Sequence, residues 1–177
     1  MTFTPVLLAL GANIGDRVAP LRSAIDLLAA VVDLDRESQV YETAPMYVID
    51  QNRFLNMVVT GRTDLSPEAL LVAIKQMERR IGRRKTERNG PRRIDIDIIL
   101  NGDRVVDDPP VLTVPHPRMA ERAFVLVPAA EIAGDWMHPV LNRTVAALAG
   151  DIRGDVGDRD LIARGPLGPA PAEGWIA

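Results

Sequence analysis

The chain contains no cysteine among its 177 residues, and aromatic side chains make up only 4% of it. Without cysteine it can form no disulfide, use no thiol nucleophile and hold no zinc through sulfur. No apolar run approaches the roughly 20 residues that a membrane-spanning helix needs. The opening MTFTPVLLALGAN lacks a basic region before its short apolar run, so we interpret it as a first strand, not a signal peptide. We therefore expect a cytoplasmic protein that does not bind membranes.

Positive charge is scarce overall and is concentrated in one segment. The formal net charge is −3, which argues against a general nucleic-acid binder. Between Arg79 and Arg93, however, 8 of 15 residues are Lys or Arg, and only Glu87 is acidic. An RNA-binding module would use such a segment as its electrostatic footprint, but it would also need stacking aromatic residues on its strands, which are missing here. We therefore expect no nucleic-acid partner, although a basic run alone is also compatible with a solvated surface.

Two helices are predicted by apolar spacing together with capping residues. The first follows the turn GANIGDR, where Asp16 or Asn13 is expected to cap it. The second begins with Ser66 as its cap and Pro67 at its first position, and it ends at Gly82. Shorter helical segments are expected over residues 121–133 and 143–150.

Strands are predicted over residues 5–10, 35–45, 53–63 and 92–100. The last of these, RRIDIDIIL, alternates cleanly and places its apolar residues on one face, namely Ile94, Ile96, Ile98 and Leu100. The order β-α-β-β-α-β predicts an α+β fold of the ferredoxin-like kind, a largely antiparallel sheet with helices packed on it in three αβα layers. We expect one domain over residues 1–160 and a Gly/Pro-rich tail over 161–177, with loose order from Asp151 onward.

Asp95 and Asp97 lie two residues apart on the strand predicted over 92–100, so both carboxylates project from the same face. Hard oxygen ligands on a rigid strand suit a divalent metal that also contacts substrate phosphates. Two aspartates at this spacing also occur on solvated strand faces, and alone they would favour that interpretation. The basic segment immediately before them supplies the complementary half of a phosphoryl-transfer site, which favours the metal.

The basic segment is rich in arginine, whose planar fork suits phosphate oxygens better than the point charge of lysine. Gly90 and Pro91 interrupt it, so it cannot be one amphipathic helix and is better explained as a loop that closes over a ligand. GANIGDR lacks the Lys-Ser/Thr ending of a P-loop. His116 lies between two prolines, where a histidine either contacts phosphate or caps a turn.

Four blocks together resemble the 6-hydroxymethyl-7,8-dihydropterin pyrophosphokinase family. They are LALGANIGDR, YETAPMYVIDQNRFLNMVV, GRRKTERNGPRRIDIDIIL and VPHPRMAERAFVLVPAAEI, and the resemblance covers residues 5–133. It implies a Mg²⁺-dependent transferase of folate biosynthesis. Such an enzyme moves the β,γ-diphosphate of ATP to the hydroxymethyl oxygen of the reduced pterin and releases AMP. The substrate's own hydroxyl is then the nucleophile, so no catalytic triad is needed.

The resemblance also implies residue roles. The catalytic residues would be Arg83, Arg92, Asp95 and Asp97, with Asp95 and Asp97 as ligands of two Mg²⁺ ions. The ATP-binding residues would be Lys75, Glu78, Arg84, Ile98, Thr113, His116 and Arg122. The pterin-binding residues would be Thr43, Ala44, Met46, Phe54, Asn56, Asp95 and Phe124. Phe54 and Phe124 would stack on the flat ring and Asn56 would hydrogen-bond its polar edge. From the residues alone, both phenylalanines fit core packing equally well.

Small molecules are therefore the expected partners, and we expect a monomer. A different Mg²⁺-dependent phosphotransferase would share the aspartates and arginines, whereas Thr43, Phe54 and Asn56 distinguish a pterin enzyme. The chain departs from the family pattern at Asn89, where many members carry a tryptophan that closes on the pterin.

Overall fold

The computed structural model describes residues 3–45, 51–84, 90–153 and 161–168. Its helices are α1 (Val18–Leu28), α2 (Pro67–Ile81), the short 3-10 helix η1 (Met119–Glu121), α3 (Ala123–Ala133) and α4 (Val145–Arg153). Its strands are β1 (Thr4–Ala12), β2 (Asp33–Glu37), β3 (Val40–Thr43), β4 (Phe54–Thr63), β5 (Asp95–Asn101), β6 (Val106–Asp108), β7 (Leu112–Val114), β8 (Met137–His138), β9 (Arg143–Thr144) and β10 (Leu161–Gly165).

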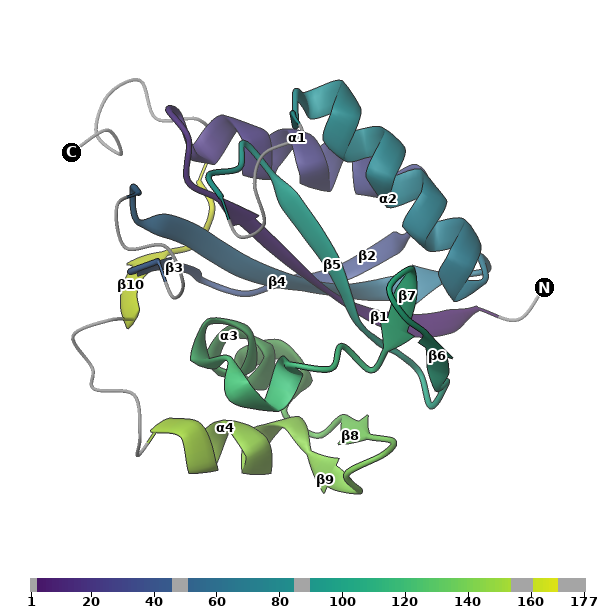
Figure 1. Ribbon diagram of the computed structural model, residues 1–177. Coiled ribbons are helices and arrows are strands. Elements are labelled where there is room, and N and C mark those ends of the chain that lie inside the picture. The colour runs from purple at the N-terminus through teal and green to yellow at the C-terminus, as the bar shows by residue number, and fades with distance from the viewer. Residues whose placement is uncertain (1–2, 46–50, 85–89, 154–160, 169–177) are drawn as a thin grey trace.

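The main sheet has six strands in the order β10-β3-β4-β1-β5, with β2 also paired to β4. Every neighbouring pair is antiparallel. Figure 1 shows α1 and α2 on one face of this sheet and α3 and α4 on the other. The order of elements and the three layers confirm the predicted ferredoxin-like α+β fold.

Two apolar cores lie on the two faces of the sheet. Leu8 of β1 packs with Leu21 and Ile74 under α1 and α2. Its neighbour Leu7 points the other way and packs with Leu126 under α3. Because successive strand residues alternate between faces, β1 is apolar on both sides, as suits an interior strand between β4 and β5. Burying each such side chain contributes about 1.5–3 kcal/mol.

The helix ends follow the sequence predictions closely. Ser66 caps α2 by accepting a hydrogen bond from the backbone N–H of Ala69 at 3.2 Å, and Gly82 ends it in the left-handed region at φ 103°. Asp16 caps α1, because its Oδ1 accepts from the first two N–H groups of the helix at 3.0 and 3.1 Å. The other candidate cap, Asn13, has a different role described below.

The single strand predicted over residues 35–45 is wrong, because two strands, β2 and β3, occupy this region. The break falls at Ser38, whose N–H donates to the carbonyl of Val58 at 2.9 Å. The hydroxyl oxygen of Ser38 accepts from the N–H of Val58, also at 2.9 Å. A side-chain hydrogen bond thus replaces one rung of the ladder, while both strands stay paired with β4.

The predicted face of Leu100 is also wrong. Ile98 lies opposite Leu8 of β1, but Leu100 lies opposite Leu7, so Ile99 is an extra residue in β5. Such a bulge shifts every later side chain to the other face. Leu100 accordingly packs under α3. The bulge also turns the carbonyl of Ile99 toward the chain beyond β7.

Part of the chain after Asp151 is more ordered than expected. Helix α4 continues to Arg153, and residues 161–165 form β10, which pairs with β3 in the main sheet. The expectation of loose order is therefore wrong for these residues. No helix in the part of the chain that the structure describes is long and apolar enough to cross a membrane.

Candidate active site

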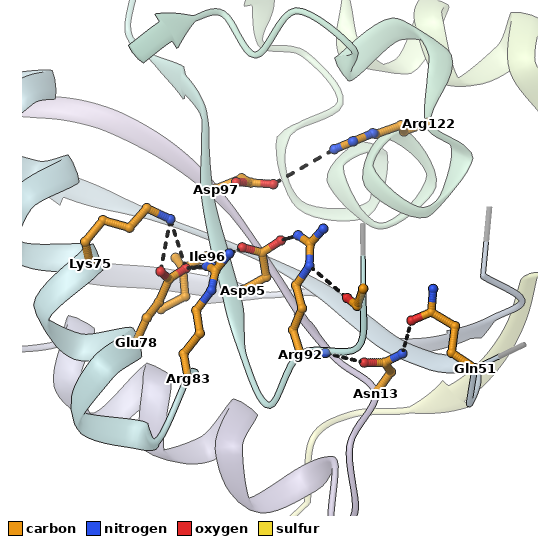
Figure 2. Close-up of polar contacts among 11 residues, drawn as sticks. Asn13, Gln51, Lys75, Glu78, Arg83, Arg92, Asp95, Ile96, Asp97 and Arg122 are labelled. Atoms are coloured by element: carbon orange, nitrogen blue, oxygen red, sulfur yellow. Dashed lines mark hydrogen bonds and ion pairs between the residues drawn. The ribbon is translucent and has the colours of Figure 1, made fainter. Parts of the chain in front are cut away.

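Asp95 and Asp97 stand at the start of β5, on the face of the sheet that carries α3. Both line one cavity, together with Arg92, which precedes the strand, and Arg122, which precedes α3. Figure 2 shows the carboxylates on the strand, with arginines approaching from both sides. The alternation of the sequence placed the two aspartates on one face, and the fold adds the arginines.

Asp95 lies between two guanidinium groups. Nη1 of Arg83 is 2.6 Å from one carboxylate oxygen, and Arg92 forms an ion pair with the other. Burial raises the pKa of Asp95, but the positive charges of Arg92 and Arg83 outweigh it, so the pKa lies below its usual value. Asp95 is therefore held ionised, with both oxygens occupied by arginine.

Glu78 of α2 is buried, 1% exposed, and is the second anchor of Arg83. Nη1 of Arg83 lies 2.5 Å from its carboxylate, and Nζ of Lys75 lies 3.0 Å from it. It also accepts a hydrogen bond from the backbone N–H of Ile96 at 2.8 Å, which ties α2 to β5. Burial lowers the pKa of Arg83, but the charges of Asp95 and Glu78 raise it above its normal value. A buried carboxylate thus fixes the arginine that reaches Asp95.

Asp97 has a different electrostatic environment. It forms an ion pair with Arg122, whose Nη1 is 3.9 Å from its Oδ2. Burial, and then the negative charge of Asp95, raise the pKa of Asp97 to about 6. The guanidinium of Arg122 also lies over the ring of Phe124, 5.5 Å from its centroid.

His116 is positioned by the bulge in β5. The backbone N–H of His116 donates to the carbonyl of Ile99 at 3.0 Å. Its Nδ1 accepts from the backbone N–H of Arg118 at 3.1 Å. Burial, followed by the charges of Arg122 and Arg118, lowers the pKa of His116 to about 4. The imidazole is therefore neutral at pH 7, with Nδ1 as a hydrogen-bond acceptor.

Five of the residues expected to bind pterin line the same cavity as Asp95 and Asp97. They are Thr43, Ala44, Phe54, Asn56 and Phe124. Asn56 donates from Nδ2 to the hydroxyl of Thr43 at 2.8 Å, which fixes its amide. Gly11 of β1 also lines the cavity, and a Cβ there would stand 3.0 Å from Oδ1 of Asn56. The aromatic faces and the amide therefore surround one space beside the carboxylates.

Asn13 is a site residue that the sequence did not reveal, and it is only 1% exposed. Its Oδ1 accepts from the N–H of Arg92 at 2.7 Å, and its own N–H donates to the carbonyl of Arg92 at 3.0 Å. Its Nδ2 donates to Gln51 Oε1 at 3.0 Å (Figure 2). The same nitrogen donates to the carbonyl of Asn52 at 3.2 Å. Asn13 thus joins three segments and fixes the backbone of Arg92. The sequence indicated only a possible helix cap, in the turn that follows an apolar strand and within the block LALGANIGDR.

Among the residues expected at the site, Arg84, Ile98 and Thr113 do not line this cavity. Arg84 lines a separate hollow with Ile14. The side chain of Ile98 is buried in the core under α1 and α2, which leaves only its backbone for a ligand. Thr113 is half-buried in β7, while Met46, like Asn89, lies outside the described residues.

The chemistry of the donor set fits a divalent cation. Asp95 and Asp97 line one cavity with hard carboxylate oxygens, and the charge of Asp95 disfavours the charge of Asp97. Within the described ranges there is no group of three or more His, Cys, Asp or Glu that could hold a metal. A cation at this pair would therefore need additional oxygen ligands from water or from a phosphate.

A ferredoxin-like sheet with paired carboxylates, several arginines and a flat aromatic pocket in one cavity defines a site of the phosphotransferase class. Comparison with known proteins identifies the family. Residues 7–134 match the family model described as 7,8-dihydro-6-hydroxymethylpterin-pyrophosphokinase (HPPK). The chain therefore belongs to the HPPK family, as the resemblance predicted.

Related proteins differ in length. The 2-amino-4-hydroxy-6-hydroxymethyldihydropteridine pyrophosphokinase of Bacillus subtilis is 48% identical over 128 residues, which cover 71% of this chain and 75% of that protein. The enzyme of the same name from Aquifex aeolicus is 38% identical over 138 residues, 78% of this chain and 86% of that protein. The mitochondrial folate synthesis bifunctional protein of Pisum sativum is 44% identical over 131 residues, 73% of this chain but only 25% of that protein. Against this and the folic acid synthesis protein fol1 of Pneumocystis carinii, the chain spans about a fifth to a quarter of the relative's length.

The fold is also that of a solved structure. The crystal structure of Plasmodium falciparum HPPK-DHPS with pteroate matches at a TM-score of 0.76 and covers 92% of this chain and 48% of that one. At 15% sequence identity this likeness supports the fold alone.

Proposed function

We propose that this protein transfers the β,γ-diphosphate of ATP to the hydroxymethyl oxygen of 6-hydroxymethyl-7,8-dihydropterin and releases AMP. The observation that carries the proposal is the shared cavity. Asp95, Asp97, Arg92 and Arg122 line it together with Phe54 and the other residues expected to bind pterin. Carboxylates and guanidinium groups suit a polyphosphate, and the aromatic rings suit a flat heterocycle beside it.

The pterin ring would lie between Phe54 and Phe124, with Asn56 at its polar edge. Because Asn56 already donates one hydrogen bond to Thr43, its amide is fixed, and its Oδ1 would be the acceptor for the ring. A fixed amide distinguishes a ring with donor groups from one without them, since the wrong ring would leave the buried oxygen unpaired.

In the reaction, the hydroxymethyl oxygen forms a bond to the β-phosphorus of ATP. The bond from that phosphorus to the oxygen bridging it to the α-phosphorus breaks, and AMP leaves with this bonding pair. The hydroxyl proton is released to solvent. Arg92 and Arg83 are suited to compensate the negative charge that moves along the phosphate chain, because they stand on both sides of Asp95. No protein nucleophile takes part.

Asp95 and Asp97 would hold Mg²⁺, as two ions in the proposed scheme. Bound Mg²⁺ supplies charge neutralisation at the phosphate oxygens and aligns them for displacement. For Asp95 to become a metal ligand, Arg83 and Arg92 must give up at least part of their contact with it. Both arginines would then be available for phosphate when the cation-bound nucleotide arrives.

The nucleotide side of the site would include Lys75, Glu78, His116 and Arg122, and Ile98 only through its backbone. His116 is neutral at pH 7 and its Nδ1 is used by the backbone, so its Nε2–H is the group available to donate to a phosphate oxygen.

The test is to incubate the protein with ATP, Mg²⁺ and 6-hydroxymethyl-7,8-dihydropterin and to separate the nucleotide products. We expect AMP in equal amount to the diphosphorylated pterin, and no AMP without Mg²⁺. Production of ADP would contradict diphosphate transfer and favour another phosphotransferase. A pterin analogue without the hydroxyl group is the matched control, because it fills the pocket but offers no nucleophile.

A further inference from the structure

Glu42 of β3 is a buried carboxylate that the proposed reaction does not use, only 6% exposed. Three arginines from three separate segments surround it. Nη1 of Arg17 lies 3.4 Å away, Nε of Arg53 lies 3.6 Å away, and Nη2 of Arg164 lies 2.5 Å away. A carboxylate so enclosed connects the chain segments that supply its partners.

These segments end at the pterin half of the cavity. Thr43, which follows Glu42, lines that cavity on the opposite face of β3. Arg17 also donates to the carbonyl of Arg53 at 3.0 Å, and the next residue is Phe54, another lining residue. Glu42 therefore ties together the ends of β3 and β4 directly behind Thr43 and Phe54.

The third partner comes from the last strand of the described chain. In β10, Leu161 lies opposite Thr43 and Ile162 lies opposite Glu42. Arg164 is two residues further on, on the diagonal, and its Nε donates to Glu42 Oε2 at 2.8 Å. Figure 1 shows β10 along the outer edge of β3, with the chain then rising toward α1. There Nη2 of Arg22 donates to the carbonyl of Leu167 at 2.6 Å.

We propose that Glu42, held by Arg164, is a positioning residue for the pterin pocket, so that β10 is part of the machinery that shapes the substrate site. The proposal rests on the proposed function. Strand β10 lies beyond residues 7–134, which carry the family match. Without its partner from β10, the carboxylate would retain only the two longer arginine contacts. The four-residue strand β3 would then be fixed less firmly at its end beside Phe54, where only its short ladder with β4 remains.

The consequence should fall on one substrate. Thr43 and Phe54 lie at the pterin half of the cavity, whereas the nucleotide half is fixed by α2 and by the Glu78–Arg83 pair. A small displacement of lining groups costs binding and alignment of the substrate that they contact. Loss of the Arg164 contact should therefore weaken pterin binding and leave ATP binding intact.

The experiment compares Arg164→Ala with Arg164→Lys and a matched control, Arg143→Ala. Arg143 forms an ion pair of similar length with Asp151 (2.6 Å), with its side chain 44% exposed against 41% for Arg164. For Arg164→Ala we expect the KM for pterin to rise about five- to tenfold, with the KM for ATP and the melting temperature close to those of Arg143→Ala. Arg164→Lys should recover part of the loss, because it restores the charge but not the fork. Equal changes in both KM values, or an effect no larger than that of Arg143→Ala, would overturn the proposal.

A binding measurement separates this proposal from the proposed function. Pterin fluorescence is titrated in the presence of Mg²⁺ and a non-hydrolysable ATP analogue. If the wild-type protein binds pterin yet forms no AMP from ATP, only the proposed function fails. If the wild type and Arg164→Ala bind pterin equally well, the positioning role of Arg164 is refuted even when AMP is formed. If the wild type binds no pterin, both proposals are refuted.

Discussion

Asn13→Ala should damage activity and stability together, because this side chain fixes the backbone of Arg92. The variant removes Oδ1, the acceptor for the N–H of Arg92 at 2.7 Å, and Nδ2, the donor to Gln51 and to the carbonyl of Asn52. A buried donor left without a partner costs about 1–3 kcal/mol. We expect the free energy of unfolding to fall by that amount.

The effect on activity follows from the guanidinium of Arg92, which pairs with Asp95. The Asn13 backbone N–H still donates to the carbonyl of Arg92, so one of the two clamping bonds survives. A displacement of about 1 Å at a group that aligns the reacting atoms costs up to roughly 10²-fold in rate. We therefore expect kcat for AMP formation to fall about ten- to a hundredfold.

Two further variants complete the experiment. Asn13→Asp keeps an oxygen that accepts from the N–H of Arg92 but loses the Nδ2 group that donates to Gln51 and to the carbonyl of Asn52. It should therefore retain more of kcat than Asn13→Ala does. Asn52→Ala is the control, because its exposed side chain is removed while the carbonyl that accepts from Asn13 remains. The reasoning is refuted if Asn13→Ala lowers the urea midpoint but leaves kcat within twofold of Asn52→Ala.

The remaining predictions concern the proposed metal ligand Asp95, the packing of the sheet and stability in acid. Asp95→Ala should lower kcat by about 10²–10³-fold, and near-normal turnover would exclude Asp95 from the mechanism. The urea midpoint should also fall, because Arg83 and Arg92 lose their shared partner. Gly61→Ala should lower the free energy of unfolding by about 1–3 kcal/mol, because the new Cβ would stand 2.5 Å from the carbonyl oxygen of Asp33. Gly150→Ala, with open space around its Cβ, should not lower it by denaturant titration. Burial raises the pKa of Glu42, but its arginine partners outweigh burial and lower it. Its stabilising contribution is therefore complete above the unfolded value of about 4.5 and lost as pH falls through the lower folded value. Glu42→Gln should flatten the dependence of unfolding free energy on pH in this acid range, and an unchanged slope would contradict the linkage.

Local patterns predicted most of the fold. Alternation placed Asp95 and Asp97 on one face of β5, and Ser66 with Gly82 set the two ends of α2. These features depend on a few neighbouring residues, so the sequence is enough. The error at Leu100 has the opposite origin. A bulge at Ile99 depends on how β5 pairs with β1, and the residue pattern of β5 alone does not predict it.

The same contrast holds for the site. The basic run that contains Arg83 and Arg92 was visible in the sequence because its charges are adjacent, and the family resemblance singled out these two arginines. Asn13 and Glu42 were missed because their partners are distant in sequence: Asn13 meets Arg92 across 79 residues, and Glu42 meets Arg164 across 122. Only the register of β1, β3 and β10 brings those partners together.

The two missed residues, Asn13 and Glu42, support opposite halves of one cavity. The site thus has a phosphate half and a pterin half with separate supports, which the lining residues alone do not show. Asn13 holds Arg92, the cation beside the carboxylates, whereas Glu42 holds the strand ends behind Thr43 and Phe54. Both supports come from the loop after β1. Arg17, four residues after Asn13 in this loop, donates to the carbonyl of Arg53. Because one short loop thus supports the phosphate side through Asn13 and the pterin side through Arg17, the relative placement of the two substrates depends on it. Alignment of a hydroxyl with a phosphorus atom is the step that a transferase without a nucleophile of its own must supply.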